Sequence, residues 1–211
     1  MSGPVFRPLV IACGALAGDL RAVLAAGGFD AHVDVEYLPA NLHNRPDTIS
    51  STLRPRLQAA VEARRPVFIA YADCGTGGGL DALLGEFPGV QRLPGAHCYE
   101  VFAGSERFEA MHDEELGTFY LTDFLTKHFD ALVWCGLGLD RHPELRATYF
   151  ANYRRVVLLS QEPGPDVLAR ACAAAARLGL PLVHHPTGRD GLRAPILAFV
   201  GSQQAHHASA R

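Results

Sequence analysis

Short, nearly continuous apolar runs alternate with helix-like segments along most of this chain. A run of this length and uniformity is typical of a strand that is buried on both faces. Such runs lie at residues 8–12, 66–71, 131–134, 156–159, 181–184 and 196–200, and residues 31–37 alternate like a further strand. Strands separated by helices form parallel sheets. The sequence therefore predicts an α/β, Rossmann-like fold with a single doubly wound, mostly parallel sheet and helices on both faces.

The segments between these runs carry helix signals. Asp47 is placed to cap one of the helices, and Gly27 and Gly28 are placed to end another. The expected helices span residues 16–26, 48–63, 79–84, 116–129, 143–153 and 166–178. No linker is long enough to divide the 211 residues. We therefore expect one α/β domain over residues 1–201 and a flexible polar tail over residues 202–211.

Charge and cysteine content exclude several classes of protein. The formal net charge is −3, which argues against a partner bound by bulk attraction to nucleic-acid phosphates. The N-terminus has no signal-peptide pattern and no apolar run is long enough to cross a membrane, so we expect a cytoplasmic chain with reduced thiols. The count of five cysteines is odd, which excludes a fully paired disulfide framework.

Cysteines follow the apolar runs at equal intervals along the chain. Cys13, Cys74 and Cys135 each come at or just after the end of an expected strand, and each precedes a glycine. Ligands of parallel sheets bind beyond the carboxyl ends of the strands. The pattern indicates an internal repeat or a shared site at one sheet edge. The simpler alternative is that each thiol is only a small buried apolar group.

Other thiol and imidazole groups lie at the same expected edge. His43 follows the second strand, and Cys98 lies in a loop beside His97 and Glu100. Thiolates and imidazoles together suit zinc, or iron in a cluster. No two cysteines are spaced Cys-X-X-Cys, so the site would be assembled from distant loops. The predicted metal ligands are Cys13, His43, Cys74 and Cys98, whereas Cys172 is expected in a helix core.

A glycine-rich loop follows the strand at residues 66–71 and opens a helix. Gly75, Thr76, Gly77 and Gly78 are the predicted cofactor-binding residues, because such loops aim amide groups at an anion. The loop resembles the first motif of S-adenosylmethionine-dependent methyltransferases, although the Asp-X-Gly opening is missing. The alternative is a tight turn that binds nothing.

Acid–base residues lie near the same edge. Glu100 follows Cys98, and Asp140 and His142 follow the strand that ends before Cys135. Carboxyl and imidazole groups supply general acid–base catalysis, although Asp140 could simply cap the next helix. Thr118, Thr122 and Asp123 interrupt an otherwise apolar expected helix and have no assigned role.

Taken together, the segments resemble the family known as domain of unknown function 1638, from about residue 8 to residue 160. The resemblance implies a one-carbon context, because such proteins are often encoded among genes for corrinoid-linked methyl transfer and methylated-amine use. It rests on residues 11–16, 37–40, 42–44, 71–77, 97–100, 117–124 and 138–144.

Four functions remain open. The first is a zinc-dependent enzyme acting on a small molecule, in which the metal activates a thiol or a water. The second is an accessory module that binds a cofactor for a methyltransferase or corrinoid protein. The third is an iron–sulfur enzyme that uses Cys13, Cys74 and Cys135. The fourth is an S-adenosylmethionine-dependent methyltransferase.

Overall fold

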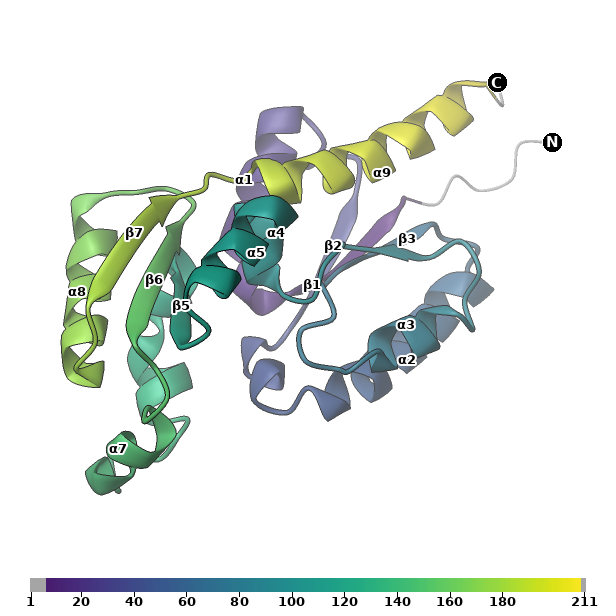
Figure 1. The fold of residues 1–211 in the computed structure, drawn as a ribbon. Coiled ribbons are helices and arrows are strands. Elements are labelled where there is room, and N and C mark those ends of the chain that lie inside the picture. The colour runs from purple at the N-terminus through teal and green to yellow at the C-terminus, as the bar shows by residue number, and fades with distance from the viewer. Residues whose placement is uncertain (1–6, 210–211) are drawn as a thin grey trace. The chain divides into compact units, whose positions relative to one another are not determined.

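Seven strands in two all-parallel sheets, with helices around them, form the architecture of the chain (Figure 1). The computed structural model describes residues 7–209, with side chains through residue 205. The α/β class with parallel strands is therefore confirmed. The strands do not form the single sheet that the sequence predicts, because they divide into a sheet of four and a sheet of three.

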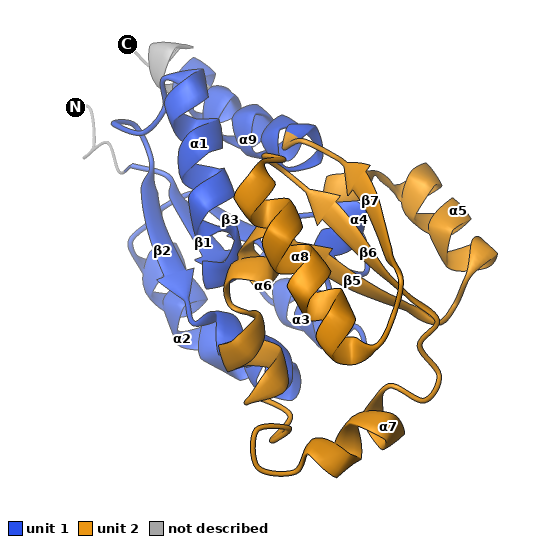
Figure 2. Cartoon of the chain, turned by 90° about the vertical axis from the view of Figure 1, so that its left-hand side faces the viewer, with its two compact units in different colours: residues 1–101, 190–211 blue, residues 102–189 orange. Residues whose placement is uncertain are grey.

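The chain also divides into two compact units (Figure 2). Unit 1 comprises residues 1–101 and 190–211, and unit 2 comprises residues 102–189. The described residues include no helix that is long and apolar enough to cross a membrane.

The sheet of unit 1 has the order β2-β1-β3-β4. Its strands are β1 (Leu9–Cys13), β2 (Asp34–Leu38), β3 (Val67–Ala70) and β4 (Gln91–Arg92). Every residue of β1 and β3 is buried, as expected for strands in the middle of a parallel sheet.

Helices lie on both faces of this sheet (Figure 1). Helices α1 and α9 pack together on one face, and α2 and α3 pack together on the other. Gly28 ends α1 in the left-handed conformation, with φ of 70°. The helices of unit 1 are η1 (Gly14–Leu16), α1 (Ala17–Gly27), η2 (Ala40–Asn44), α2 (Asp47–Glu62), α3 (Gly79–Leu84) and α9 (Asp190–Ser209). Helix α4 (Cys98–Ala103) begins in unit 1 and ends in unit 2.

Helix α9 corrects two expectations for the end of the chain. Residues 196–200 are helical, because Ile196, Phe199 and Val200 follow the helical spacing and are all buried. Residues 202–209, expected as a tail, continue the same helix, and residues 210–211 lie outside the described part.

Unit 2 contains the sheet β5-β6-β7. Its strands are β5 (Thr118–Thr122), β6 (Arg155–Ser160) and β7 (Leu182–Pro186). Its helices are α5 (Ser105–Glu114), α6 (Asp123–Lys127), η3 (Asp130–Trp134), η4 (Pro143–Leu145), α7 (Arg146–Tyr149) and α8 (Pro165–Leu178). A core of aliphatic and aromatic side chains from β5, β6 and α8 holds this unit together.

Three expectations for unit 2 are wrong. The helix expected over residues 116–129 is a strand followed by a short helix, because β-branched and aromatic residues fill β5 and the hydroxyl of Thr122 caps α6. The strand expected over residues 131–134 is a π-helix, in which Phe129 and Val133 face the core from successive turns. The helix expected over residues 143–153 is reduced to the short η4 and α7.

Candidate functional site

The carboxyl end of each strand in unit 1 is followed by one thiol or imidazole side chain. Cys13 is the last residue of β1, and His43 lies in η2 directly after β2. Cys74 follows β3, and Cys98 begins α4 after β4. Cys13 pairs with Leu38 in the β1–β2 register, so β1 and β2 end level with each other. The four residues that the sequence predicts as metal ligands thus all lie at or after the carboxyl ends of the strands of unit 1.

Cys13 and His43 are in direct contact. Cys13 Sγ lies 3.5 Å from His43 Nδ1, which also lies 3.2 Å from the carbonyl oxygen of Ala40. The backbone N–H of Ala15 donates to Cys13 Sγ at 3.3 Å. Cys13 is only 2% exposed. The thiol is therefore fixed from two sides in a buried position.

Cys74 connects this pair to Cys98. Its side chain interacts with the thiol and the backbone N–H of Cys98 and with the His43 side chain. The loop before α4 is held against it, because the backbone N–H of Cys74 donates to the carbonyl of Ala96 at 2.8 Å. Cys74 is 7% exposed and adopts φ of 52°, which is rare for a residue other than glycine. Such a conformation is often found at functional positions.

Interactions among these side chains favour the charged forms of Cys74 and His43. The hydrogen bond from the Cys98 thiol is the largest cause that lowers the pKa of Cys74 to about 5; burial opposes it and His43 adds to it. Burial alone would lower the pKa of His43, but its interactions with Cys13 and Cys74 raise that pKa to about 11. The pKa of Cys98 is raised, first because its proton is held by Cys74. At neutral pH the site therefore contains a thiolate beside an imidazolium.

Two buried polar atoms in this cluster have no hydrogen-bond partner. They are Nε2 of His43 and the hydroxyl oxygen of Tyr71. The two rings are stacked, with centroids 6.1 Å apart. Burial and the neighbouring Cys13 sulfur raise the pKa of Tyr71. Buried polar atoms without partners are uncommon in folded proteins and often indicate a missing ligand or water.

The ionisation of Cys74 gives a direct prediction for the metal-free chain. A group with a lowered pKa is charged above that pKa, so the thiolate absorbance lost in Cys74→Ser should rise with a midpoint near pH 5. In Cys98→Ser the midpoint should move upward, because the main stabilising hydrogen bond is removed. An unchanged midpoint in Cys98→Ser, or a wild-type midpoint between about pH 8 and 9 as for an ordinary thiol, would contradict the arrangement.

The glycine loop is occupied by a side chain of the protein. The carboxylate of Asp73 accepts hydrogen bonds from the Thr76 hydroxyl and from the backbone N–H groups of Gly77 and Gly78. Gly75, Gly77 and Gly78 all have positive φ, which explains the glycines. The backbone N–H groups of Thr76, Gly77 and Gly78, which were expected to hold a cofactor, are therefore bonded to Asp73, the residue before Cys74.

The three expected acid–base residues are divided between the two units. Glu100 lies on α4, where its carboxylate accepts the backbone N–H of Ala96 at 2.8 Å and so braces the loop that carries Cys98. Asp140 and His142 belong to unit 2 and are exposed. His142 Nδ1 lies 3.2 Å from a carboxylate oxygen of Glu144.

The two remaining cysteines, Cys135 and Cys172, are in unit 2. Cys135 follows the π-helix η3 rather than a strand, so the repeat of three strand-end cysteines is not present. Cys172 lies on α8 and is exposed, which corrects the expectation of a helix-core thiol.

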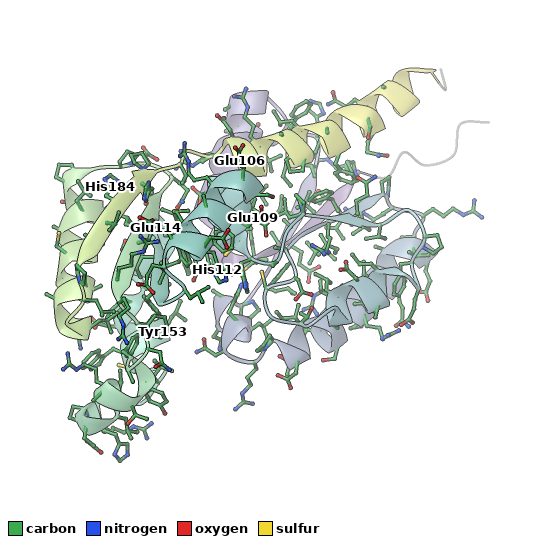
Figure 3. All side chains as sticks on the ribbon, in the orientation of Figure 1. Glu106, Glu109, His112, Glu114, Tyr153 and His184 are labelled. Carbon is green, nitrogen blue, oxygen red and sulfur yellow. The ribbon has the colours of Figure 1, made fainter. Side chains whose placement is uncertain are left out.

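Other polar groups do not form a comparable cluster. Figure 3 shows Glu106, Glu109 and His112 along α5, where all three are exposed, and His184 on β7. His184 Nε2 is 2.7 Å from the Ser160 hydroxyl, and this hydroxyl is buried. Among the described residues, no group of three or more His, Cys, Asp or Glu side chains is placed so that it could hold a metal ion.

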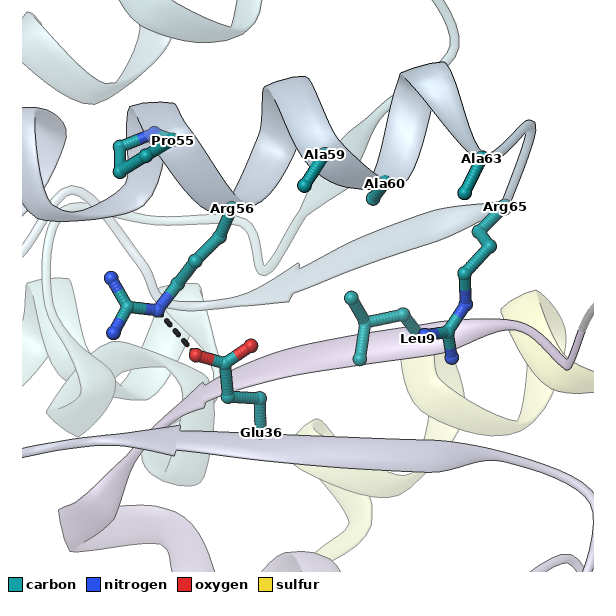
Figure 4. Close-up of a pocket in the computed structure, with 8 residues that line it drawn as sticks. All are labelled: Leu9, Glu36, Pro55, Arg56, Ala59, Ala60, Ala63 and Arg65. Carbon is teal, nitrogen blue, oxygen red and sulfur yellow. Dashed lines mark hydrogen bonds and ion pairs between the residues drawn. The ribbon is translucent and has the colours of Figure 1, made fainter.

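A groove of about 360 Å³ lies between α2 and the sheet of unit 1, near the start of β1 (Figure 4). Alanine side chains line much of it, and Arg56 donates to Glu36 there. The groove carries no thiol or imidazole and is not part of the cysteine cluster.

Comparison with known protein families assigns the chain to a family. Residues 37–195 match the family described as "Protein of unknown function (DUF1638)". The chain belongs to this family. Within the DUF1638 match lie His43, Cys74 and Cys98, whereas Cys13 precedes it. No curated protein and no solved structure matches the chain.

Proposed function

We propose that unit 1 of this DUF1638 protein binds one thiophilic metal ion, with zinc as the first candidate, through Cys13, His43, Cys74 and Cys98. The observation that carries the proposal is that the four strand ends each supply one sulfur or nitrogen donor to the same buried cluster. Three thiolates and one imidazole are a common donor set for zinc.

The distance between two of these donors fits such an ion. In a tetrahedral site, ligand bonds of about 2.3 Å to sulfur and about 2.0 Å to nitrogen place the two atoms roughly 3.5 Å apart. Cys13 Sγ and His43 Nδ1 have this separation. The donors are linked in pairs and do not yet surround one point. Binding would replace the hydrogen bond between the Cys74 and Cys98 thiols by two metal–sulfur bonds.

The surrounding residues define what the chain would contribute. A bound zinc ion would keep its thiolates deprotonated and could activate a thiol or an oxygen of a substrate. Glu100 would hold the Cys98 loop, and the Asp73 carboxylate would hold the turn at Cys74. The buried hydroxyl of Tyr71 lies next to Cys13 and could donate to its sulfur.

The proposed activity is alkyl transfer to or from sulfur, a reaction that suits a thiolate-ligated zinc ion. This reaction agrees with the one-carbon context implied by the family resemblance, and a corrinoid protein or methyltransferase stays a predicted partner. A module that binds the ion without catalysis is the main alternative. The iron–sulfur alternative loses its basis because Cys135 does not follow a strand. The methyltransferase alternative is weakened because Asp73 occupies the loop amides.

Cobalt(II) titration of the metal-free, reduced chain tests the metal site. Bound cobalt should give intense sulfur-to-metal charge-transfer bands that reach their maximum at one equivalent, with tetrahedral ligand-field bands. Cys13→Ser should weaken the charge-transfer bands, and Cys172→Ser should leave them unchanged because Cys172 is exposed on α8. A spectrum of free hydrated cobalt throughout the titration would overturn the proposal.

A further inference from the structure

The proximity of Cys74 and Cys98 suits a reaction other than metal binding. The two side chains interact with each other, and backbone hydrogen bonds join the segments that carry them. Two neighbouring thiols held by the backbone in this way are suited to thiol–disulfide exchange.

The backbone around the two cysteines holds them together. The backbone N–H groups of Asp73 and Cys74 donate to the carbonyls of Gly95 and Ala96 at 3.1 Å and 2.8 Å. These two bonds join the turn after β3 to the loop before α4. The thiols therefore stay adjacent although 23 residues separate them in the sequence. A Cys-X-X-Cys spacing is not needed to produce this proximity.

Strain and position distinguish Cys74 from the other cysteines. Among the described non-glycine residues, positive φ occurs at Arg64 and Cys74 alone. Cys135 and Cys172, in contrast, are exposed; Cys135 directly follows η3, and Cys172 lies on α8 of unit 2.

We propose that Cys74 and Cys98 are a redox-active dithiol that exchanges with low-molecular-weight disulfides, and that formation of the Cys74–Cys98 disulfide switches the site off. The second part rests on the proposed function, because the disulfide would remove two of the four metal donors. The first part concerns the metal-free chain and holds without the ion.

The exchange occurs in two balanced steps. The Cys74 thiolate attacks one sulfur of the small disulfide, forms a mixed disulfide and releases one small thiolate. Cys98 then loses its proton to that thiolate or to water, attacks the Cys74 sulfur and releases the second small thiolate, which takes up a proton. Starting from the Cys74 thiolate, the protein loses two electrons and the Cys98 proton, and the second proton comes from the solvent. The small disulfide gains two electrons and two protons and becomes two thiols.

Oxidised glutathione and the full-length, metal-free chain provide the test. Cys135 and Cys172 are first replaced by Ser, because an exposed thiol can form mixed disulfides of its own. We expect peptide mass spectrometry without reduction to find one linkage, between Cys74 and Cys98, that dithiothreitol reverses. With Cys98→Ser added, Cys74 should retain the mixed disulfide. Free thiols at both positions, or separate mixed disulfides on both, would overturn the inference.

Metal binding is then measured on the same samples. The reduced chain should bind zinc, and the oxidised chain should bind it at least about 100-fold more weakly because two ligands are lost. A disulfide in a chain that never binds zinc supports the dithiol and overturns the metal site. Zinc binding in a chain that never forms the disulfide supports the metal site and overturns the dithiol. Equal zinc affinity of the reduced and oxidised chains would overturn the switch.

Discussion

We expect Cys74→Ser to abolish the proposed zinc binding and the stabilisation that the bound ion would supply. Serine keeps the size of the side chain but offers a hydroxyl, which is a poor zinc ligand. At a free zinc concentration of about 1,000 times the dissociation constant, binding stabilises a folded chain by about 4 kcal/mol. For a chain of this length, that corresponds to a rise in Tm of roughly 10 °C. Thermal unfolding with and without zinc measures it.

The matched control is Cys135→Ser, because Cys135 is exposed and follows η3 in unit 2. Its zinc-dependent rise in Tm should equal that of the unmodified chain. Cys74→Ser should unfold at one temperature whether zinc is present or absent. A zinc-dependent rise of full size in Cys74→Ser would show that the metal binds elsewhere.

The second large effect is expected at Gly14. A Cβ atom at this position would lie 2.8 Å from the carbonyl oxygen of Leu38 and 3.3 Å from the backbone N of Ala40. Both contacts are backbone atoms, one at the last residue of β2 and one at the first residue of η2, the segment that carries His43. In Gly14→Ala the backbone next to Cys13 or the backbone before His43 must therefore shift. We expect a loss of roughly 1–3 kcal/mol in stability and of about 10–100-fold in zinc affinity.

Gly18→Ala is the control for this substitution. Gly18 lies in α1, and nothing lies within 4 Å of a Cβ atom placed there. Alanine favours a helix over glycine by up to about 1 kcal/mol, so Gly18→Ala should be neutral or stabilising. Denaturant unfolding measures the stability of both variants, and zinc titration measures their zinc affinity. Equal zinc affinity in the two variants would disprove the close packing at Gly14.

The location of the site follows from the sequence because strand ends are a local feature. Cys13 and Cys74 follow uniformly apolar runs, and both runs are buried strands. His43 and Cys98 could be added from their chemistry, since thiols and imidazoles suit the same ions. The strand β4 before Cys98 has only two residues, Gln91 and Arg92, and leaves no apolar run to detect. Tyr71 was missed because its position beside His43 and Cys13 depends on packing.

The incorrect predictions of secondary structure and sheet organisation occur where tertiary packing overrides the local sequence pattern. Thr118 to Thr122 sits beside helix-forming residues, and only pairing with β6 makes it a strand. The apolar segment Asp130–Trp134 has the composition of a strand, yet Phe129 and Val133 are buried by adopting successive helical turns. The division into two sheets depends on which strands pair, and no short segment of sequence contains that information.

The most direct test of the account is the metal content of the full-length chain, purified without oxygen and without added metal or chelator. Elemental analysis by mass spectrometry, with protein quantified by amino-acid analysis, gives the ratio of each metal to chain. The account predicts about one zinc per chain, which is lost when Cys13, His43, Cys74 and Cys98 are replaced together. A chain that contains no stoichiometric metal, and takes up none from a zinc solution after full reduction, would contradict it.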